Sequence, residues 1–173
     1  MEFTTQSFTI ADLYNWHNTG ELDLSPRFQR RLVWSNAARS YLVDTVARGL
    51  PMPKIFYRMQ IDPVAIKSVR EVVDGQQRLR ALFSFIDGEF TVYASHNEDI
   101  GGRRFARLPE EVRDAILRYE ITADLLIGAT DTAVLQIFAR INSYSVTLND
   151  QEKRNAKFAG AFKSLAYDLG TRH

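Results

Sequence analysis

Cysteine is missing from the 173-residue sequence, which excludes disulfides, iron–sulfur clusters and any zinc or thiol chemistry that needs a cysteine side chain. Histidine is nearly as scarce. His17, His96 and His173 lie far apart and show none of the spacings that zinc ligands have. The sequence therefore predicts neither a zinc centre nor a thiol enzyme.

Long apolar runs and an excess of one charge are lacking too. No apolar stretch approaches the length of a membrane span, and the N-terminal residues show no basic-then-apolar signal segment, so we expect a cytoplasmic protein without membrane contact. The 22 basic and 21 acidic residues give a net charge of +1. This balance disfavours a general polyanion-coating protein, so contact with nucleic acid would need a local patch.

The two commonest nucleotide-binding motifs are also absent. The sequence has no Gly-x-x-x-x-Gly-Lys loop and no Gly-x-Gly-x-x-Gly turn, so the P-loop and Rossmann routes to a nucleotide do not apply. The length suits one domain with an ordinary core.

The most informative stretch present runs from residue 71 to residue 86. Residues 71–73 (Glu-Val-Val) predict a short buried strand, and Asp74-Gly75 predicts a turn. A helix follows, because apolar residues recur at helical spacing at Leu79, Leu82, Phe83 and Ile86. A strand therefore ends and a helix begins within a few residues.

Such a junction favours an anion, because the first N–H groups of a helix lack intrahelical partners and carry partial positive charge. Gln76 and Gln77 add amide groups, and Arg78 adds a planar cation suited to phosphate oxygens. Asp74 fits beside a phosphate if it holds a cation, accepts a hydrogen bond from a sugar, or orients Arg78. On residue types alone, a strand-turn-helix with polar capping residues is the simpler explanation.

Three segments together resemble the N-terminal domain of the GmrSD family, which occurs in modification-dependent restriction and phage-defence proteins. The first is Asp74-Gly75-Gln76-Gln77-Arg78 with its apolar helix. The second is residues 26–34 (PRFQRRLVW), which are similar to the family's N-terminal "QR…W" box. The third is residues 138–142 (FARIN), continuing through Leu148 to residues 152–156 (EKRNA). The order is that of the family, and the segments span most of the chain.

A more distant likeness runs to ParB and sulfiredoxin-like domains. It implies an α+β fold in which a small mixed sheet packs with several helices, and in which a turn at the same junction cradles nucleotide phosphates. We expect one such domain over residues 1–173, with C-terminal helices from about residue 130. Ile141 and Ser145 replace the glutamate and arginine of the third ParB box, so that family's exact metal ligands and CTP preference do not carry over.

The resemblance implies a domain that binds and hydrolyses a nucleoside triphosphate in DNA restriction or phage defence. Asp74 and Arg78 are the expected catalytic residues. Mg²⁺ is the expected cofactor, held by Asp74, Asn142 and Glu152. The expected nucleotide contacts are Gln29, Arg30, Gly75, Gln76, Gln77, Arg78, Arg140 and Asn142.

Two other functions stay open from the sequence. One is a non-catalytic ParB-like module that binds a nucleotide or DNA and switches partners, and the other is a DNA-binding fragment of a nuclease. GmrSD-like proteins usually continue into a helical region and often into an HNH-type nuclease. We therefore expect an excised N-terminal part or a minimal relative, with DNA and a nuclease domain or subunit as partners. Oligomer formation is compatible with the sequence.

Two site assignments have structural alternatives. Glu152 shares a face with apolar residues and needs a partner, which is either a metal ion or an arginine such as Arg78 or Arg30 in an ion pair. The arginines and aromatics of residues 27–34 either bind a phosphate and stack a base or form a packed loop with acidic neighbours.

The rest of the chain predicts further elements. Helices are expected after Thr9, Ser35, Pro109 and Thr130, because each can cap or begin a helix. Strands are expected at residues 54–59, 90–93 and 121–127, with an exposed loop at residues 60–68 and a mobile loop at residues 96–104.

Overall fold

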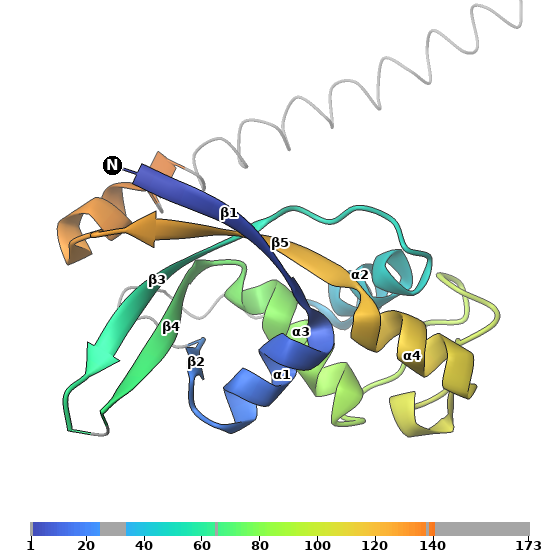
Figure 1. Ribbon diagram of the computed structural model, residues 1–173. Coiled ribbons are helices and arrows are strands. Elements are labelled where there is room, and N and C mark those ends of the chain that lie inside the picture. Colours follow the sequence, from blue (N-terminus) through green and yellow to red (C-terminus); the bar gives the residue numbers. More distant parts are fainter. Residues whose placement is uncertain (1, 25–33, 65, 138, 141–173) are drawn as a thin grey trace, which may run out of the picture. The chain divides into compact units, whose positions relative to one another are not determined.

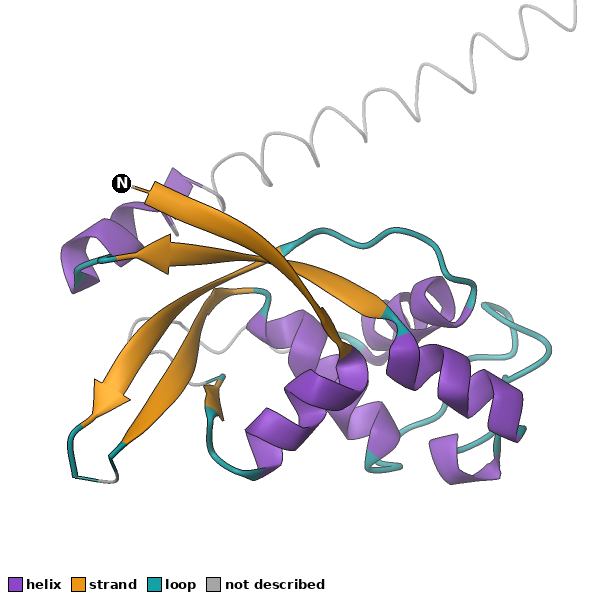
Figure 2. Ribbon diagram, viewed as in Figure 1, coloured by secondary structure: helices purple, strands orange, loops and turns teal. Residues whose placement is uncertain are grey.

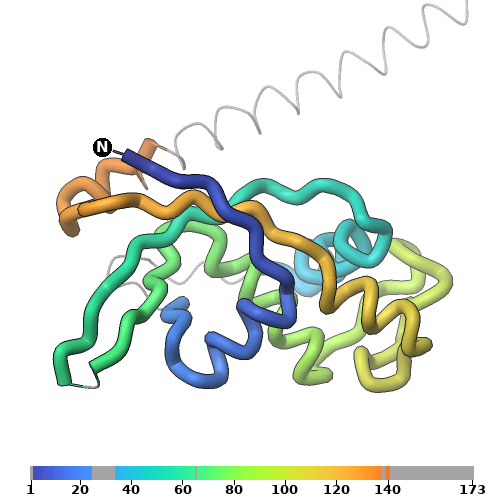
Figure 3. Tube along the Cα trace, viewed as in Figure 1, coloured from blue at the N-terminus to red at the C-terminus, as the bar shows by residue number. Residues whose placement is uncertain are grey.

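The computed structural model describes residues 2–24, 34–64, 66–137 and 139–140. The chain divides into two compact units, residues 1–129 and 130–173, and each is described by itself. The first unit is a twisted sheet with helices packed on one side (Figures 1 and 3).

Five strands form one mixed sheet in the order β1-β5-β3-β4-β2. Neighbours pair antiparallel in β1/β5 and β3/β4 and parallel in β3/β5 and β2/β4. This mixed α+β architecture confirms the predicted fold class. The strand bounds are β1 (Glu2–Thr9), β2 (Leu22–Asp23), β3 (Ile55–Asp62), β4 (Lys67–Asp74) and β5 (Glu120–Ile127).

Helices cover one face of this sheet (Figure 2). They are α1 (Ile10–Asn18), α2 (Asn36–Ala47), α3 (Gln76–Ile86), α4 (Glu110–Arg118) and a short 3-10 turn, η1 (Phe105–Arg107). Their apolar sides and the sheet share one core, in which the side chains of Leu13, Val43, Leu79, Phe85 and Ile116 are almost completely buried against Ile55 and Val72. The opposite face of the sheet is not covered by these helices.

The predicted helix starts are confirmed. Three of them have a side-chain cap, and the helix predicted at Pro109 begins at Glu110 without one. Thr9 accepts a hydrogen bond from the Asp12 N–H at 3.1 Å and completes a capping box with the Asp12 side chain, and Ser35 accepts one from the Ala38 N–H at 3.2 Å. In the second unit Thr130 accepts from the Ala133 N–H at 3.3 Å, and residues 131–137 and 139–140 are helical.

The strand predicted at residues 90–93 is wrong, because this segment makes no ladder in the structure. Its apolar residues are explained by burial alone. Val92 is 1% exposed, and the Phe90 ring packs at 5.6 Å from the ring of Phe85, with the Arg39 guanidinium above it at 4.2 Å. A buried loop and a buried strand show the same apolar residues.

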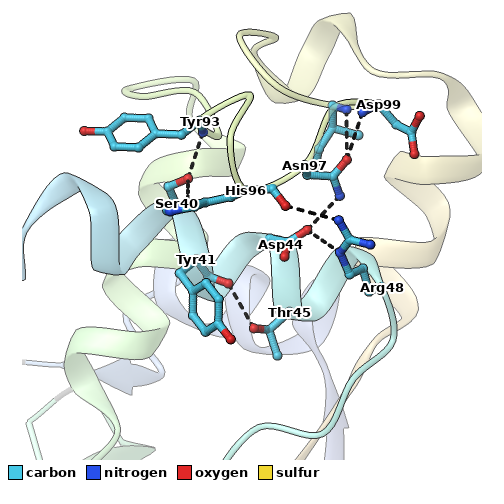
Figure 4. A network of polar contacts seen from close by, with 10 residues as sticks. Ser40, Tyr41, Asp44, Thr45, Arg48, Tyr93, His96, Asn97 and Asp99 are labelled. Atoms are coloured by element: carbon cyan, nitrogen blue, oxygen red, sulfur yellow. Dashed lines mark hydrogen bonds and ion pairs between the residues drawn. The ribbon is translucent and has the colours of Figure 1, made fainter. Parts of the chain in front are cut away.

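The loop after residues 90–93 is held against α2 by polar side chains (Figure 4). Ser40 contacts His96 Nδ1 at 2.7 Å, Asn97 donates to Asp44 at 2.8 Å, and Arg48 reaches both Asp44 and the His96 carbonyl. The loop and Arg48 line a polar hollow of about 360 Å³. These contacts attach the loop to α2. The loop predicted at residues 96–104 is confirmed, and its mobility stays a prediction.

Three other differences concern strand extent. Strands β3 and β4 continue through residues expected in the 60–68 loop, so that among the described residues only 63, 64 and 66 lie between the two strands. Strand β1 escaped prediction because it is an edge strand with mostly polar, exposed residues and no buried apolar face. Strand β2 is too short to give a pattern.

Candidate functional site

The predicted strand-turn-helix junction is confirmed. Strand β4 ends at Asp74, Gly75 adopts φ +102°, and α3 begins at Gln76. A Cβ added at Gly75 would lie 2.4 Å from Cγ2 of Ile55. Both the backbone conformation and the close approach of β3 therefore require glycine at this position.

The N-terminus of α3 has no side-chain cap, in contrast to those of α1 and α2. The N–H groups of its first turn have no carbonyl partner within the helix, and the helix dipole places partial positive charge among them. An anion placed at this end would satisfy these groups.

Gln76 is turned inward. Its side chain is 2% exposed, and Nε2 donates to the carbonyl oxygens of Val72 at 2.5 Å and Val73 at 2.8 Å. The amide thus ties the first turn of α3 to the end of β4. Gln77 is partly exposed and is the glutamine with access to a ligand.

Arg78 and Asp74 form the central ion pair of the junction. Arg78 Nη2 lies 2.6 Å from Asp74 Oδ2, and Nη1 donates to the carbonyl oxygens of Pro53 and, at 3.2 Å, Lys54. The side chains of Arg78 and Asp74 are 11% and 19% exposed. Among the roles that the sequence left open for Asp74, these contacts provide one, because the carboxylate orients Arg78.

The electrostatics of Arg78 follow from its position. Burial lowers the pKa of the guanidinium from its ordinary value, and the carboxylate of Asp74 opposes that shift. An arginine stays charged at neutral pH even so. Its contacts use two N–H groups at Nη1 and one at Nη2, so Nε and the second Nη2 N–H have no partner within the described part of the chain.

A β-bulge sets the direction of Asp74. Tyr57 pairs with Val72, but Phe56 pairs with Asp74, so Val73 is skipped. In a regular ladder Phe56 would face Val73, and Asp74 would point to the opposite side. The register shift thus brings Asp74 opposite Phe56, at the end of β4 where it reaches Arg78 of α3.

The face of the sheet that carries Phe56 holds a second ion pair, which was not predicted from the sequence. The register aligns Asp74, Phe56, Asp124 and Thr5 across four neighbouring strands. Asp124 is 1% exposed, accepts from the Thr5 hydroxyl at 2.7 Å and forms an ion pair with Lys54. The available signal was a single carboxylate inside the apolar run of residues 121–127.

A third pair lies farther along the same face. Arg58 Nε is 2.7 Å from Glu71 Oε2, and Arg58 also donates to the carbonyl oxygen of Ala129 at 3.2 Å. Both side chains are nearly buried. The face of the sheet that lacks helices α1–α4 is therefore lined by paired charges.

The remaining predicted site residues are not brought together by the structure. Gln29, Arg30, Asn142 and Glu152 lie outside the described residues. Arg140 is exposed on the helix of the second unit. Within the described ranges no group of three His, Cys, Asp or Glu residues could hold a metal ion, so the Mg²⁺ site stays a prediction.

The fold and this junction define a class: a small α+β domain with an uncapped helix N-terminus beside an oriented arginine. The family of GmrSD restriction endonuclease N-terminal domains matches residues 10–159, which is most of the chain. The chain belongs to this family and so to the components of restriction and phage-defence systems. No curated protein and no solved structure matches it. Among the described helices, none is both long and apolar enough to cross a membrane.

Replacing Gly75 by alanine tests the packing of the junction. The methyl group would meet Ile55 and would occupy a backbone conformation that costs an L-residue ~1–2 kcal/mol. With the overpacking term added, we expect the free energy of unfolding to fall by about 3 kcal/mol in urea denaturation. Gly49→Ala is the matched control, because Gly49 has φ +65° and open space around it. Equal losses in the two variants would contradict the close approach of Ile55.

Arg78→Ala tests the buried pair. It leaves Asp74 and two backbone carbonyls without their cation, so we expect the free energy of unfolding to fall by roughly 2–4 kcal/mol. The double variant with Asp74→Ala should lose less than the sum of the two single losses. Arg118→Ala is the control, because Arg118 forms the same i,i+4 pair with Asp114 at an exposed position and should unfold like the wild type. Additive losses at residues 74 and 78 would refute the coupling.

Proposed function

We propose that this domain binds a nucleoside triphosphate at the junction of β4 and α3 and hydrolyses it in the service of DNA restriction. One observation carries the proposal. The N-terminus of α3 has no side-chain cap and lies beside the largely buried Arg78. The guanidinium of Arg78 is held in place by its contacts, and its Nε and second Nη2 N–H have no partner among the described residues. Family membership supplies the biological setting.

The phosphate chain would lie at the N-terminal end of α3, next to the turn at Gly75. The N–H groups of the first turn of α3 and the side chain of Gln77 would donate to phosphate oxygens. Arg78 would use its Nε and Nη2 donors to neutralise charge on the transferred phosphoryl group. Because Asp74 and two carbonyls already orient the guanidinium, little conformational entropy is lost when the ligand binds.

Mg²⁺ fits the chemistry of this site. Asp74 Oδ2 is engaged by Arg78, whereas Oδ1 has no hydrogen bond to the described residues and could supply one oxygen ligand. Mg²⁺ prefers such oxygens and keeps several waters, and when bound it would neutralise phosphate charge. Asn142 and Glu152 are the other proposed ligands. Gln29, Arg30 and Arg140 are proposed as further nucleotide contacts, with DNA and a nuclease domain or subunit as partners.

A second candidate function is a non-catalytic switch module that binds a nucleotide or DNA without turnover. One observation favours it. Asp74 is the carboxylate of the junction, and its Oδ2 already accepts a hydrogen bond from Arg78 at 2.6 Å, so this oxygen is not available to take a proton from an attacking water.

Phosphate release from each of the four common nucleoside triphosphates with Mg²⁺ distinguishes these functions. We expect Arg78→Ala to lower turnover about 10- to 100-fold, because a hydrogen bond to a charged group is worth ~1.5–3 kcal/mol. Arg78→Lys should recover part of the activity, since it keeps the charge but loses the fork of donors. Arg118→Ala should behave like the wild type.

The outcomes separate clearly when every variant is first shown to keep the wild-type circular dichroism spectrum. Turnover by the wild type that is unchanged in both Arg78→Ala and Asp74→Ala would refute the proposed site. Binding of a non-hydrolysable triphosphate without turnover of any natural one would favour the switch module.

A further inference from the structure

A second cation, Lys54, lies beside the junction. The segment Pro53-Lys54-Ile55 runs along the turn, because Ile55 packs against Gly75 and Arg78 donates to the carbonyl oxygens of Pro53 and Lys54. The backbone of Lys54 is thus fixed by Arg78 itself. A substitution of Arg78 would therefore affect the position of Lys54, and a substitution of Lys54 that of Arg78.

The Lys54 ammonium group is held on the face of the sheet that carries Phe56 and Asp124. It forms an ion pair with Asp124 and lies 5.2 Å from the ring centre of Phe56 and 5.8 Å from that of Phe3. The Lys54 side chain is 46% exposed, whereas that of Asp124 is 2% exposed. The ammonium group thus lies close to a carboxylate and two rings, and much of the side chain remains accessible to a ligand.

The two cations flank Phe56. In the register of the sheet, Asp74 and Asp124 lie on opposite sides of Phe56, and they hold Arg78 and Lys54 respectively. Neighbouring strands are ~4.8 Å apart, so the backbones of Asp74 and Asp124 are separated by roughly 10 Å.

Burial of Asp124 also needs an explanation. An ionised carboxylate in the interior is costly unless it is paired and hydrogen-bonded, and an apolar residue would fill this position in the strand without that cost. Thr5 and Lys54 satisfy its two oxygens. Its presence is accounted for if it keeps an ammonium group at this position.

We infer that Lys54 is a second phosphate-binding cation of the site and that Asp124 positions it. This inference rests on the proposed function. The two cations then act differently. Arg78 is held at three points and gives a fixed orientation, while the ammonium group of Lys54 has three donors and can bind a phosphate oxygen while it stays paired with Asp124. The two carboxylates are each neutralised by a partner, which limits their repulsion of the ligand.

The test is the affinity of the full chain for a non-hydrolysable nucleoside triphosphate and for inorganic triphosphate, measured by calorimetry. We expect Lys54→Met to weaken both about tenfold, which corresponds to the loss of one charge-assisted hydrogen bond. Lys54→Arg should stay within about threefold of the wild type, because it restores the charge. Lys67→Met is the matched control, since Lys67 lies at the hairpin end of β4, far along the strand from Gly75.

Two negative outcomes distinguish the role of Lys54 from the proposed function. If Lys54→Met and Lys54→Gln bind like the wild type while Arg78→Ala loses affinity, the role of Lys54 is refuted and the proposed function stands. If the wild type binds neither compound, both proposals are refuted. Thermal melting of each variant checks that a loss of affinity is not a loss of fold.

Discussion

The ion pair between Arg78 and Asp74 is the interaction on which the site depends. One guanidinium joins the end of β4, the first turn of α3 and the segment before β3, because it contacts Asp74 and the carbonyls of Pro53 and Lys54 at once. Burial of this charge costs desolvation, which the three contacts offset. The same geometry leaves Nε and the second Nη2 N–H of Arg78 without a partner in the described part of the chain.

Sheet register determines which groups share that site. A register shift between β3 and β4 brings Asp74 opposite Phe56, and the parallel pairing of β3 with β5 brings Asp124 into line with it. The helices pack on the face of the sheet that carries the apolar core. The paired charges on the other face keep its buried polar groups satisfied.

The sequence predicted what depends on local pattern. The turn at Gly75, the caps at Thr9 and Ser35, and the amphipathic helix after Gln76 each follow from a few adjacent residues. Contacts between distant residues could not be predicted this way. Nothing near Lys54 indicates that its partner is Asp124, 70 residues away, and nothing near Asp74 indicates a bulge. The strand expected at residues 90–93 was wrong because burial, which sets the apolar pattern, does not require a ladder.

The most direct test of the site is a titration of the isotope-labelled chain with a non-hydrolysable nucleoside triphosphate, followed by the amide signals in a nuclear magnetic resonance spectrum. The account predicts saturable shifts that are largest for the backbone N–H groups of Gly75, Gln76 and Gln77, with small shifts at the capped start of α2. Saturable binding whose shifts spare the start of α3, or a spectrum that does not change, would contradict it.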